Sequence, residues 1–307
     1  MNKKTYLIEK AEKGLTIQQY LKQIAGFSNA QIRSMKFTEN GICLGGQRAR
    51  VTTRLSEGDV LEVLLETKNS SSAHLLSFEQ MPDILYEDAD VIAVNKPAGM
   101  AVHPSHGHYQ DTLANQLAYY FRKNTQQVEI HSIGRLDLET SGIVLFAKHR
   151  AAAARLSRQR EDGRLQKTYL AICSGIFAEK NGTLNGAIAP LPGSLMKMCV
   201  SKDGKPAVTH YQVQKQYMEA ALVQLTLETG RTHQIRVHMA DAGHPLIGDR
   251  LYFADTDQKA DVDAENCFTG IKRAALHASR ICFYQPFEGK RITVEAPFPE
   301  DMKKCLF

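Results

Sequence analysis

One short segment of the chain, residues 131–142, brings a carboxylate and a guanidinium together between glycines; its sequence is HSIGRLDLETSG. An apolar run, 143–146, follows directly, so the segment reads as a loop that leads into a strand, a place where reactive residues are common. A carboxylate held next to an arginine stays ionised, so Asp137 could act as a nucleophile or as a base. The plainer interpretation of these residue types is that Asp137 caps a turn or pairs with Arg135.

A second segment rich in reactive groups, residues 228–238, has the sequence ETGRTHQIRVH. Arg231 and Arg236 suit the recognition of phosphate or carboxylate groups. His233 and His238 are five residues apart, which is not the i, i+4 spacing of a helical zinc pair, and the chain has no H-E-x-x-H motif. The histidines of the 103–108 loop have no cysteine nearby, so we expect no metal at either place.

The chain also lacks the sequence patterns of three large enzyme classes. It contains no G-x-x-x-x-G-K-[ST], no G-x-G-x-x-G after a strand and no G-x-S-x-G. These absences argue against a P-loop NTPase, a dinucleotide-dependent oxidoreductase and an α/β-hydrolase. We therefore expect chemistry that needs no cofactor.

The elements that would position these loops belong to an α+β body with a mixed sheet. Apolar, β-branched runs predict strands at 90–94, 142–146, 168–172, 220–227 and 291–294. Helical spacing and capping residues predict helices at 111–121, 150–160 and 235–242. The acidic stretch 254–270 has little apolar content and is expected to be an exposed loop. It lacks the glycine of a calcium-binding turn, so we do not expect it to bind calcium.

The front of the chain, about residues 14–66, predicts a separate small module of two helices followed by strands. Ser28 and Gln31 have the spacing of a capping box, which would begin the second helix. Polar, small residues then suggest a linker at 68–81, which divides the chain into domains at 1–67 and 82–307. The module collects basic residues suited to phosphate contacts; they are Arg33, Lys36, Arg48, Arg50 and Arg54.

Composition limits the class of protein further. The 307 residues are 43% hydrophobic and 23% charged, the balance of a folded chain. No apolar run reaches the roughly 20 residues of a membrane helix, and no signal core follows the N-terminus. Six well-separated cysteines without a C-x-x-C pair indicate free thiols in a reducing compartment. The net charge of +5 is compatible with a polyanionic partner. We expect a cytoplasmic monomer without an obligate protein partner.

Several motifs in series resemble the RluA-type family of RNA pseudouridine synthases, over about residues 82–298. These motifs are GRLD and TSG within 134–142, NKPAG and HP within 95–104, KTY at 167–169, GRTHQIRVH at 230–238, GHP and GD within 243–249, and ALHA at 275–278. The front module resembles the small alpha-L, or S-four-type, RNA-binding domain, although its opening Lys13-Gly14-Leu15-Thr16 departs from the usual pattern. That module accompanies the rRNA-modifying branches of the family.

The resemblance implies an isomerase that detaches uracil from ribose, rotates it and rejoins it through carbon five, without cofactor or metal. Asp137 matches the essential aspartate, which attacks either the base or starts ribose deprotonation. Tyr169 matches a tyrosine that stacks on the base and could take the final proton. Arg236 matches the basic residue that ion-pairs with the aspartate, with Arg231 as its rival. Arg135 matches the arginine that enters the stack where the uridine flips out.

The same resemblance makes the other polar residues of the second segment, His233 and Gln234, candidates for RNA contacts together with Arg231. The RNA is expected to be large-subunit rRNA before tRNA. Two other functions compete: a non-catalytic RNA-binding or ribosome-assembly factor, and a hydrolase acting through Asp137 and His233. The intact Asp137 motif speaks against the first, and the front module against the second.

Overall fold

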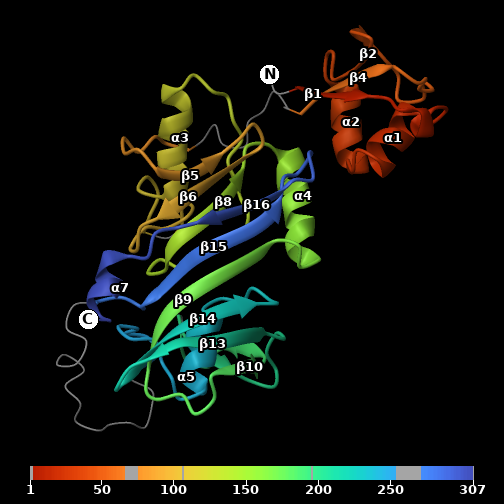
Figure 1. Cartoon of the computed structure of the whole chain (residues 1–307). Helices are drawn as coiled ribbons and strands as arrows, with labels where there is room; N and C mark the ends of the chain where they lie inside the picture. The colour runs from red at the N-terminus through yellow and green to blue at the C-terminus, as the bar shows by residue number, and fades with distance from the viewer. Residues whose placement is uncertain (1–2, 66–74, 106, 195, 254–270, 307) are drawn as a thin grey trace.

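The computed structural model describes residues 3–65, 75–105, 107–194, 196–253 and 271–306 (Figure 1). Two sheets organise them. A four-stranded antiparallel sheet is built from the front of the chain, and a ten-stranded sheet from the rest. A further two-stranded sheet pairs β11 (Ile188–Pro190) with β12 (Met198–Val200). No helix in the described part of the chain is long and apolar enough to cross a membrane.

The front sheet has the strand order β1-β4-β2-β3. Its strands are β1 (Lys3–Leu7), β2 (Ile42–Leu44), β3 (Gln47–Arg48) and β4 (Val60–Leu64). A short 3₁₀ turn, η1 (Lys10–Glu12), precedes the helices α1 (Ile17–Gln23) and α2 (Asn29–Phe37). The predicted start of the second helix is confirmed, because the Ser28 hydroxyl accepts from the Gln31 N–H and the Gln31 side chain accepts from the Ser28 N–H. β1 was not predicted, since its alternating polar sequence gives only a weak strand signal.

The large sheet has the order β10-β13-β14-β9-β15-β8-β6-β5, with β16 on β15 and β7 on β8. Its strands are β5 (Asp83–Glu87), β6 (Val91–Lys96), β7 (His131–Ser132), β8 (Ser141–Ala147), β9 (Gln166–Ser174), β10 (Asn181–Asn185), β13 (Val208–Gln216), β14 (Ala220–Leu227), β15 (Leu276–Tyr284) and β16 (Arg291–Glu295). β15 and β8 run parallel while the other pairs are antiparallel. The predicted α+β class with a mixed sheet is therefore confirmed.

Helices cover both faces of the sheet near β6 and β8, which explains their unbroken apolar sequences. α3 (Leu113–Lys123) packs on one face, and α4 (Arg150–Glu161) packs on the other. α5 (Gln234–Asp241) packs against β9 and β14 through Ile235 and Met239. The last helix, α7 (Glu300–Lys304), packs near the C-terminus. All three predicted helices of the body are confirmed to within two residues.

β13 and the linker show where sequence patterns fail. β13 is largely polar because much of it is exposed, although it pairs with both β10 and β14. The predicted linker 68–81 is also too long. Leu75 is 5% exposed and packs with α3, and its carbonyl accepts from Arg122 at 2.6 Å. The apolar Leu75 therefore joins the body's core. The division into domains at 1–67 and 82–307 stays a prediction.

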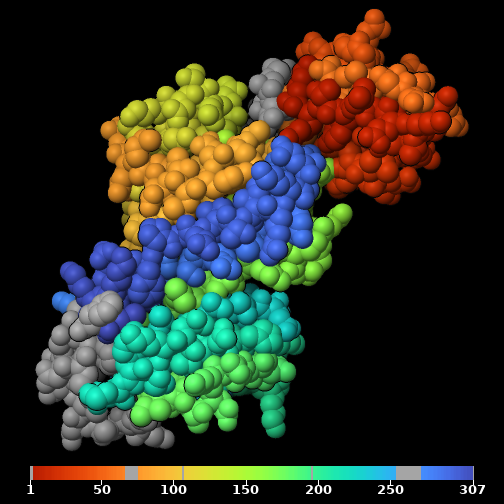
Figure 2. Space-filling view, viewed as in Figure 1, coloured from red at the N-terminus to blue at the C-terminus, as the bar shows by residue number. Residues whose placement is uncertain are grey.

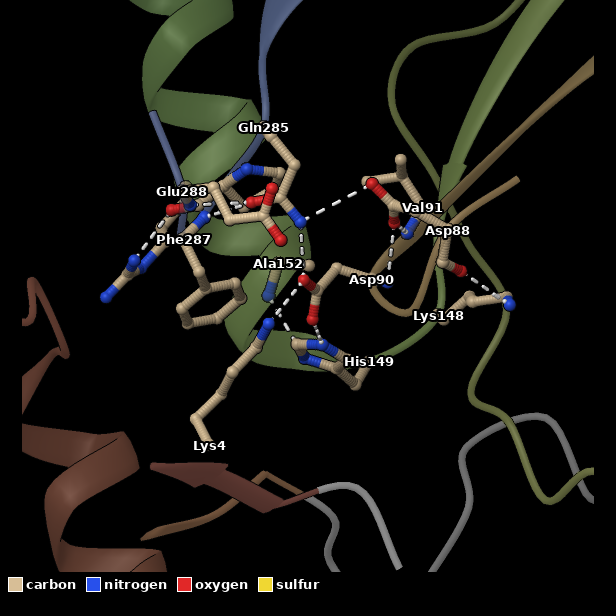
Figure 3. A network of polar contacts seen from close by, with 12 residues as sticks. Lys4, Asp88, Asp90, Val91, Lys148, His149, Ala152, Gln285, Phe287 and Glu288 are labelled. Atoms are coloured by element: carbon tan, nitrogen blue, oxygen red, sulfur yellow. Dashed lines mark hydrogen bonds and ion pairs between the residues drawn. The ribbon is translucent and has the colours of Figure 1, made fainter. Parts of the chain in front are cut away.

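The front unit touches one end of the body, as Figure 2 shows. The contact centres on Asp90, whose carboxylate is fully buried (Figure 3). It accepts from Lys4 Nζ at 2.7 Å and from Gln285 Nε2 at 2.6 Å, and it lies 2.8 Å from His149 Nε2. The Arg155 guanidinium lies 5.0 Å from the Phe27 ring of the front unit. A buried ion pair and a cation–π contact therefore join the two sheets.

Replacing Asp90 by asparagine is expected to lower the free energy of unfolding by about 2–3 kcal/mol, because it leaves the part-buried Lys4 ammonium without its anion. Burial alone raises the pKa of Asp90, but the hydrogen bonds from His149, Lys4 and Gln285 outweigh it and lower the pKa to about 2. The advantage of the wild type over Asp90→Asn should therefore be complete above about pH 4 and disappear as the pH falls towards 2.

Urea unfolding of the full chain at a series of pH values measures this difference. Asp162→Asn is the matched control, because Asp162 pairs with Arg164 at the surface, where water screens the ion pair. Equal unfolding midpoints for the two variants at pH 7 would contradict the role given to Asp90.

Candidate active site

The loop that carries Asp137 connects β7 to β8 and is fastened by several donors. The Leu138 carbonyl accepts from the Gly99 N–H at 2.8 Å and from Lys96 Nζ at 3.1 Å. The Thr140 N–H donates to the Asp137 carbonyl at 3.1 Å and closes a turn. The backbone is thus held at and just after Asp137, whose side chain remains 30% exposed and can be reached from solvent.

Lys96 is a fully buried cation behind this loop. Its Nζ donates to the carbonyl oxygens of Pro97 at 2.9 Å, Met100 at 2.8 Å and Leu138 at 3.1 Å. Burial lowers the pKa of Lys96 to about 7, although the charge of Asp137 acts in the opposite direction. Because its hydrogen bonds end on carbonyls of two different loops, Lys96 clamps residues 97–100 to the loop of Asp137.

Arg236, on α5, lies close to the Asp137 carboxylate. Its Nη1 is 3.9 Å from Asp137 Oδ2, and its Nη2 is 3.8 Å from Glu139 Oε2. Its shortest contacts go elsewhere: Nε and Nη2 donate to the two carboxylate oxygens of Asp249 at 2.6 and 2.7 Å. The structure therefore brings Arg236 and Asp137 together as neighbours, while the bidentate partner of the guanidinium is Asp249.

The pair of Arg236 and Asp249 is almost completely buried, with both residues at most 5% exposed. Burial lowers the pKa of Arg236, but the hydrogen bonds and charge of Asp249 outweigh it and raise the pKa. The Tyr252 ring lies 5.1 Å from the guanidinium. Gly248 precedes Asp249 with a φ of +74°, and a Cβ there would lie 2.2 Å from the Arg273 carbonyl oxygen. The turn that presents Asp249 therefore requires glycine.

Tyr169 lies in β9 between Leu225 of β14 and Ala278 of β15, and it is buried. Burial, and to a lesser extent the charge of Asp137, raises the pKa of its phenol, so the phenol is neutral at neutral pH. Gly142 allows β8 to approach β15 closely, because a Cβ there would lie 2.3 Å from the Ala278 carbonyl oxygen. This approach brings the strand that follows the Asp137 loop next to the strand that pairs with β9.

His233 immediately precedes α5 with a left-handed backbone conformation, φ 56° and ψ 20°. Its Nδ1 is 2.9 Å from the Tyr252 hydroxyl, which also accepts from the Met198 N–H at 2.9 Å. Burial lowers the pKa of His233, and among the charged groups that act on it Asp137 comes first, in the opposite direction. His233 therefore belongs to the same cluster as Asp137 and Arg236.

The other two predicted residues of this segment differ from each other. Gln234 is 3% exposed, and its amide is used inside the protein: it donates to the Val208 carbonyl and accepts from the Arg231 N–H, both at 3.0 Å. This side chain closes the loop, which differs from the RNA contact expected for it. Arg231 is exposed and donates through Nε to the Pro206 carbonyl at 3.0 Å.

The remaining predicted RNA contacts are all exposed. Arg135 lies in the Asp137 loop itself, after Gly134, whose φ is +82°. The others are in the front unit, separate from the Asp137 cluster (Figure 1); they are Arg33, Lys36, Arg48 and Arg50. Arg48 donates to the Lys36 carbonyl at 3.3 Å, so α2 and β3 present their charges side by side.

No group of three or more histidine, cysteine, aspartate or glutamate side chains that could hold a metal ion occurs within the described residues. His106, one of the three histidines of the 103–108 loop, lies outside those residues, and so does the stretch 254–270.

Sequence reasoning did not assign a role to Lys96, Asp249 or Tyr252. Lys96 and Asp249 stood in recognised motifs, and a lysine inside an apolar strand was a signal that it is buried and paired. Tyr252 follows Asp249 by three residues, but only the folded chain shows that its hydroxyl meets His233. The site as a whole places the partly exposed carboxylate of Asp137 beside the buried guanidinium of Arg236 and the neutral phenol of Tyr169. Such a site suits nucleophilic attack with charge compensation.

Comparison with known proteins gives a consistent result. Residues 90–241 match the profile of the family described as RNA pseudouridylate synthase. The uncharacterized RNA pseudouridine synthase YjbO of Bacillus subtilis is 36% identical over 293 residues, covering 95% of this chain and 98% of its own. The ribosomal large subunit pseudouridine synthase D of Neisseria meningitidis (strain Z2491) is 38% identical over 267 residues, covering 86% and 67%.

A solved structure agrees with these sequences. Human RNA Pseudouridylate Synthase Domain Containing 4 aligns with a TM-score of 0.60 and 25% identity, over 73% of this chain and 91% of that chain.

The clamp formed by Lys96 leads to a test of stability. Lys96→Met keeps most of the side-chain volume but removes the donor to the Pro97 and Met100 carbonyls and one of the two donors to the Leu138 carbonyl. We expect the free energy of unfolding to fall by about 1–3 kcal/mol, together with faster amide exchange in residues 137–140. Urea unfolding and hydrogen-exchange mass spectrometry measure both effects. Lys215→Met, at an exposed lysine, is the control; unchanged exchange in the loop of Lys96→Met would contradict the clamp.

Proposed function

Because the chain belongs to the RluA-type family of RNA pseudouridine synthases, we propose that its substrate is large-subunit ribosomal RNA and that Asp137 is its nucleophile. Family membership makes the chain an isomerase that acts on RNA. The observation that carries the proposal is the position of Asp137: a partly exposed carboxylate on a clamped loop, 3.9 Å from a buried guanidinium.

Asp137 is the group that begins the reaction, by attack on the base or by starting deprotonation of the ribose. The guanidinium of Arg236 compensates its charge at a distance that leaves both carboxylate oxygens free of a short ion pair. Asp249 keeps the guanidinium fixed while the carboxylate of Asp137 reacts. A preorganised charge of this kind needs little reorganisation during the reaction.

Tyr169 and Arg135 handle the target nucleotide. The neutral phenol of Tyr169 suits stacking on uracil, and it cannot take the proton from carbon five while it keeps its own. The exposed Arg135, two residues before Asp137, is placed to fill the space in the RNA stack that the flipped uridine leaves. Arg231 and His233 would contact the RNA around this position.

Two observations support ribosomal RNA as the substrate. Relatives from Neisseria meningitidis and Haemophilus influenzae, at 38% and 35% identity, are named ribosomal large subunit pseudouridine synthase D. The helices and sheet of the front unit support an S-four-like RNA-binding domain with exposed cations on α2 and β3. Transfer RNA is the second candidate.

The nucleophile is tested by tritium release from RNA labelled at carbon five of uracil, using total RNA from cells that lack the protein. The wild type should release tritium, whereas Asp137→Asn should release less than one part in a thousand of that amount yet bind the RNA within about threefold of the wild type. Equal loss of binding and release would indicate a structural aspartate. Tight binding without release by the wild type would favour a non-catalytic RNA-binding factor.

The front unit is tested by the salt dependence of RNA binding. Replacing four of its exposed cations, Arg33, Lys36, Arg48 and Arg50, by glutamine should weaken binding and reduce the slope of log K against log salt by about 3, since each lost phosphate contact removes roughly 0.7–0.9. Filter binding at several salt concentrations between about 50 and 300 mM, a roughly sixfold range, measures the slope.

A control removes two exposed lysines from the opposite part of the molecule, Lys180→Gln and Lys215→Gln. It should change the slope by less than about 1. An unchanged slope in the variant with all four substitutions would show that these four cations do not contact phosphate.

A further inference from the structure

We propose that His233 is a further catalytic residue: its uncharged imidazole donates a hydrogen bond from Nε2 to a carbonyl oxygen of the uracil ring and stabilises the negative charge that develops there. The inference rests on the proposed function, in which Asp137 starts the detachment of uracil. It gives His233 a role in the reaction beyond a general contact with RNA.

The backbone of His233 is the first observation. It is one of three non-glycine residues with positive φ in the described part of the chain; the others are Asn40 and Thr125. A left-handed conformation in a residue with a side chain costs of order 1–3 kcal/mol and persists where the surroundings fix it. Here the residue caps α5 without a side-chain hydrogen bond to the helix, so its imidazole is directed to other partners.

The hydrogen bond with Tyr252 determines which nitrogen carries the proton. The Tyr252 hydroxyl accepts from the Met198 N–H at 2.9 Å and lies 2.9 Å from His233 Nδ1. Tyr252 is 4% exposed, and a buried hydroxyl needs an acceptor for its own proton. Donation to Nδ1 satisfies it, so the proton of the neutral imidazole is on Nε2. Nε2 makes no hydrogen bond with the described residues and is left for a ligand.

Burial keeps His233 neutral, although most of the charges around it act in the opposite direction. Burial lowers the pKa of His233; the Asp137 charge opposes this, the Arg236 charge adds to it, and the charges of Asp249 and Glu139 oppose it. A half-buried imidazole that is uncharged at neutral pH still carries one N–H, and it can donate a hydrogen bond from it. Contacts link His233 to the nucleophile: Tyr252 lies 2.9 Å from His233 Nδ1 and its ring lies 5.1 Å from the Arg236 guanidinium, whose Nη1 is 3.9 Å from Asp137 Oδ2.

The chemistry needs a donor at this place. When the bond between ribose carbon one and uracil nitrogen one breaks, its electron pair stays on the ring and is shared with the carbonyl oxygens. Attack on carbon six instead places the charge on the oxygen at carbon four. In both routes a carbonyl oxygen becomes more negative in the transition state, and a fixed donor then binds it more strongly than in the ground state. No proton is transferred, so the balance of the isomerisation is unchanged.

Other groups in the cluster are committed elsewhere. Nε and Nη2 of Arg236 bind Asp249, and its Nη1, which is charged, lies beside the Asp137 carboxylate. Glu139 accepts from the Ala274 N–H at 3.2 Å and, as a carboxylate, can only accept. Asp249 is buried under the guanidinium. His233 is the neutral donor that the described cluster offers with a free N–H.

The test compares His233→Phe, which keeps a ring but has no donor, with His233→Gln, which keeps an amide donor. Single-turnover rates of uracil detachment are measured on one RNA that carries uridine at the target site and on the same RNA with 5-fluorouridine. Fluorine itself stabilises negative charge on the ring, so loss of the donor matters less for that substrate. His210→Phe, at an exposed histidine of β13, is the matched control and should keep the wild-type rate.

With uridine, His233→Phe should lower the rate by about 10²–10³-fold with little change in RNA affinity, as expected for loss of one charge-stabilising donor. With 5-fluorouridine the loss should be at least about tenfold smaller, and His233→Gln should recover part of the rate. The proposal is overturned by an unchanged rate, by equal losses on the two RNAs, or by loss of affinity alone. If His233→Phe does not fold, the ratio of the rates of His233→Gln on the two RNAs decides in the same way. A wild type that forms no pseudouridine would instead contradict the proposed function.

Discussion

The ion pair of Arg236 and Asp249 is the interaction on which the active site depends. A guanidinium removed from water is costly unless a carboxylate binds it in a bidentate geometry, and Asp249 does so from a turn that only Gly248 can make. Because Asp249 already binds the guanidinium, Arg236 can lie 3.9 Å from Asp137 without binding it tightly. Asp137 therefore remains near a positive charge and still available for reaction.

The other groups of the site surround Arg236 and Asp137, which lie close together without a short ion pair. Lys96 holds the backbone of the reactive loop from behind, Arg236 supplies charge from one side, and Tyr169 supplies an aromatic surface from the sheet. None of these groups takes its position from the loop itself. They come from three different elements of the body, so the geometry of the site follows from the packing of the ten-stranded sheet and its helices.

Local signals explain what could be predicted from the sequence. The apolar run 143–146 and the capping box of Ser28 depend on neighbours in the chain, and both are confirmed. The motif around Asp137 also predicted a loop before an apolar strand, and the chain does form a loop there between β7 and β8. The roles of Asp249 and Tyr252 could not be predicted, because each acts on a residue of another element that only the fold brings close. β13 escaped prediction for a different reason: its exposed face gives it a polar sequence.

The order of strands in the large sheet has a consequence for synthesis of the chain on the ribosome. β15 lies between β9 and β8, yet it ends at Tyr284, more than 100 residues after β9. Until it emerges, β8 and β9 each have an open hydrogen-bonding edge, and open edges favour association between chains. The front unit can complete its own sheet early, as domains do when they fold during translation. The body instead waits for its central strand, so the nascent chain is vulnerable to aggregation throughout the interval between the synthesis of β9 and that of β15.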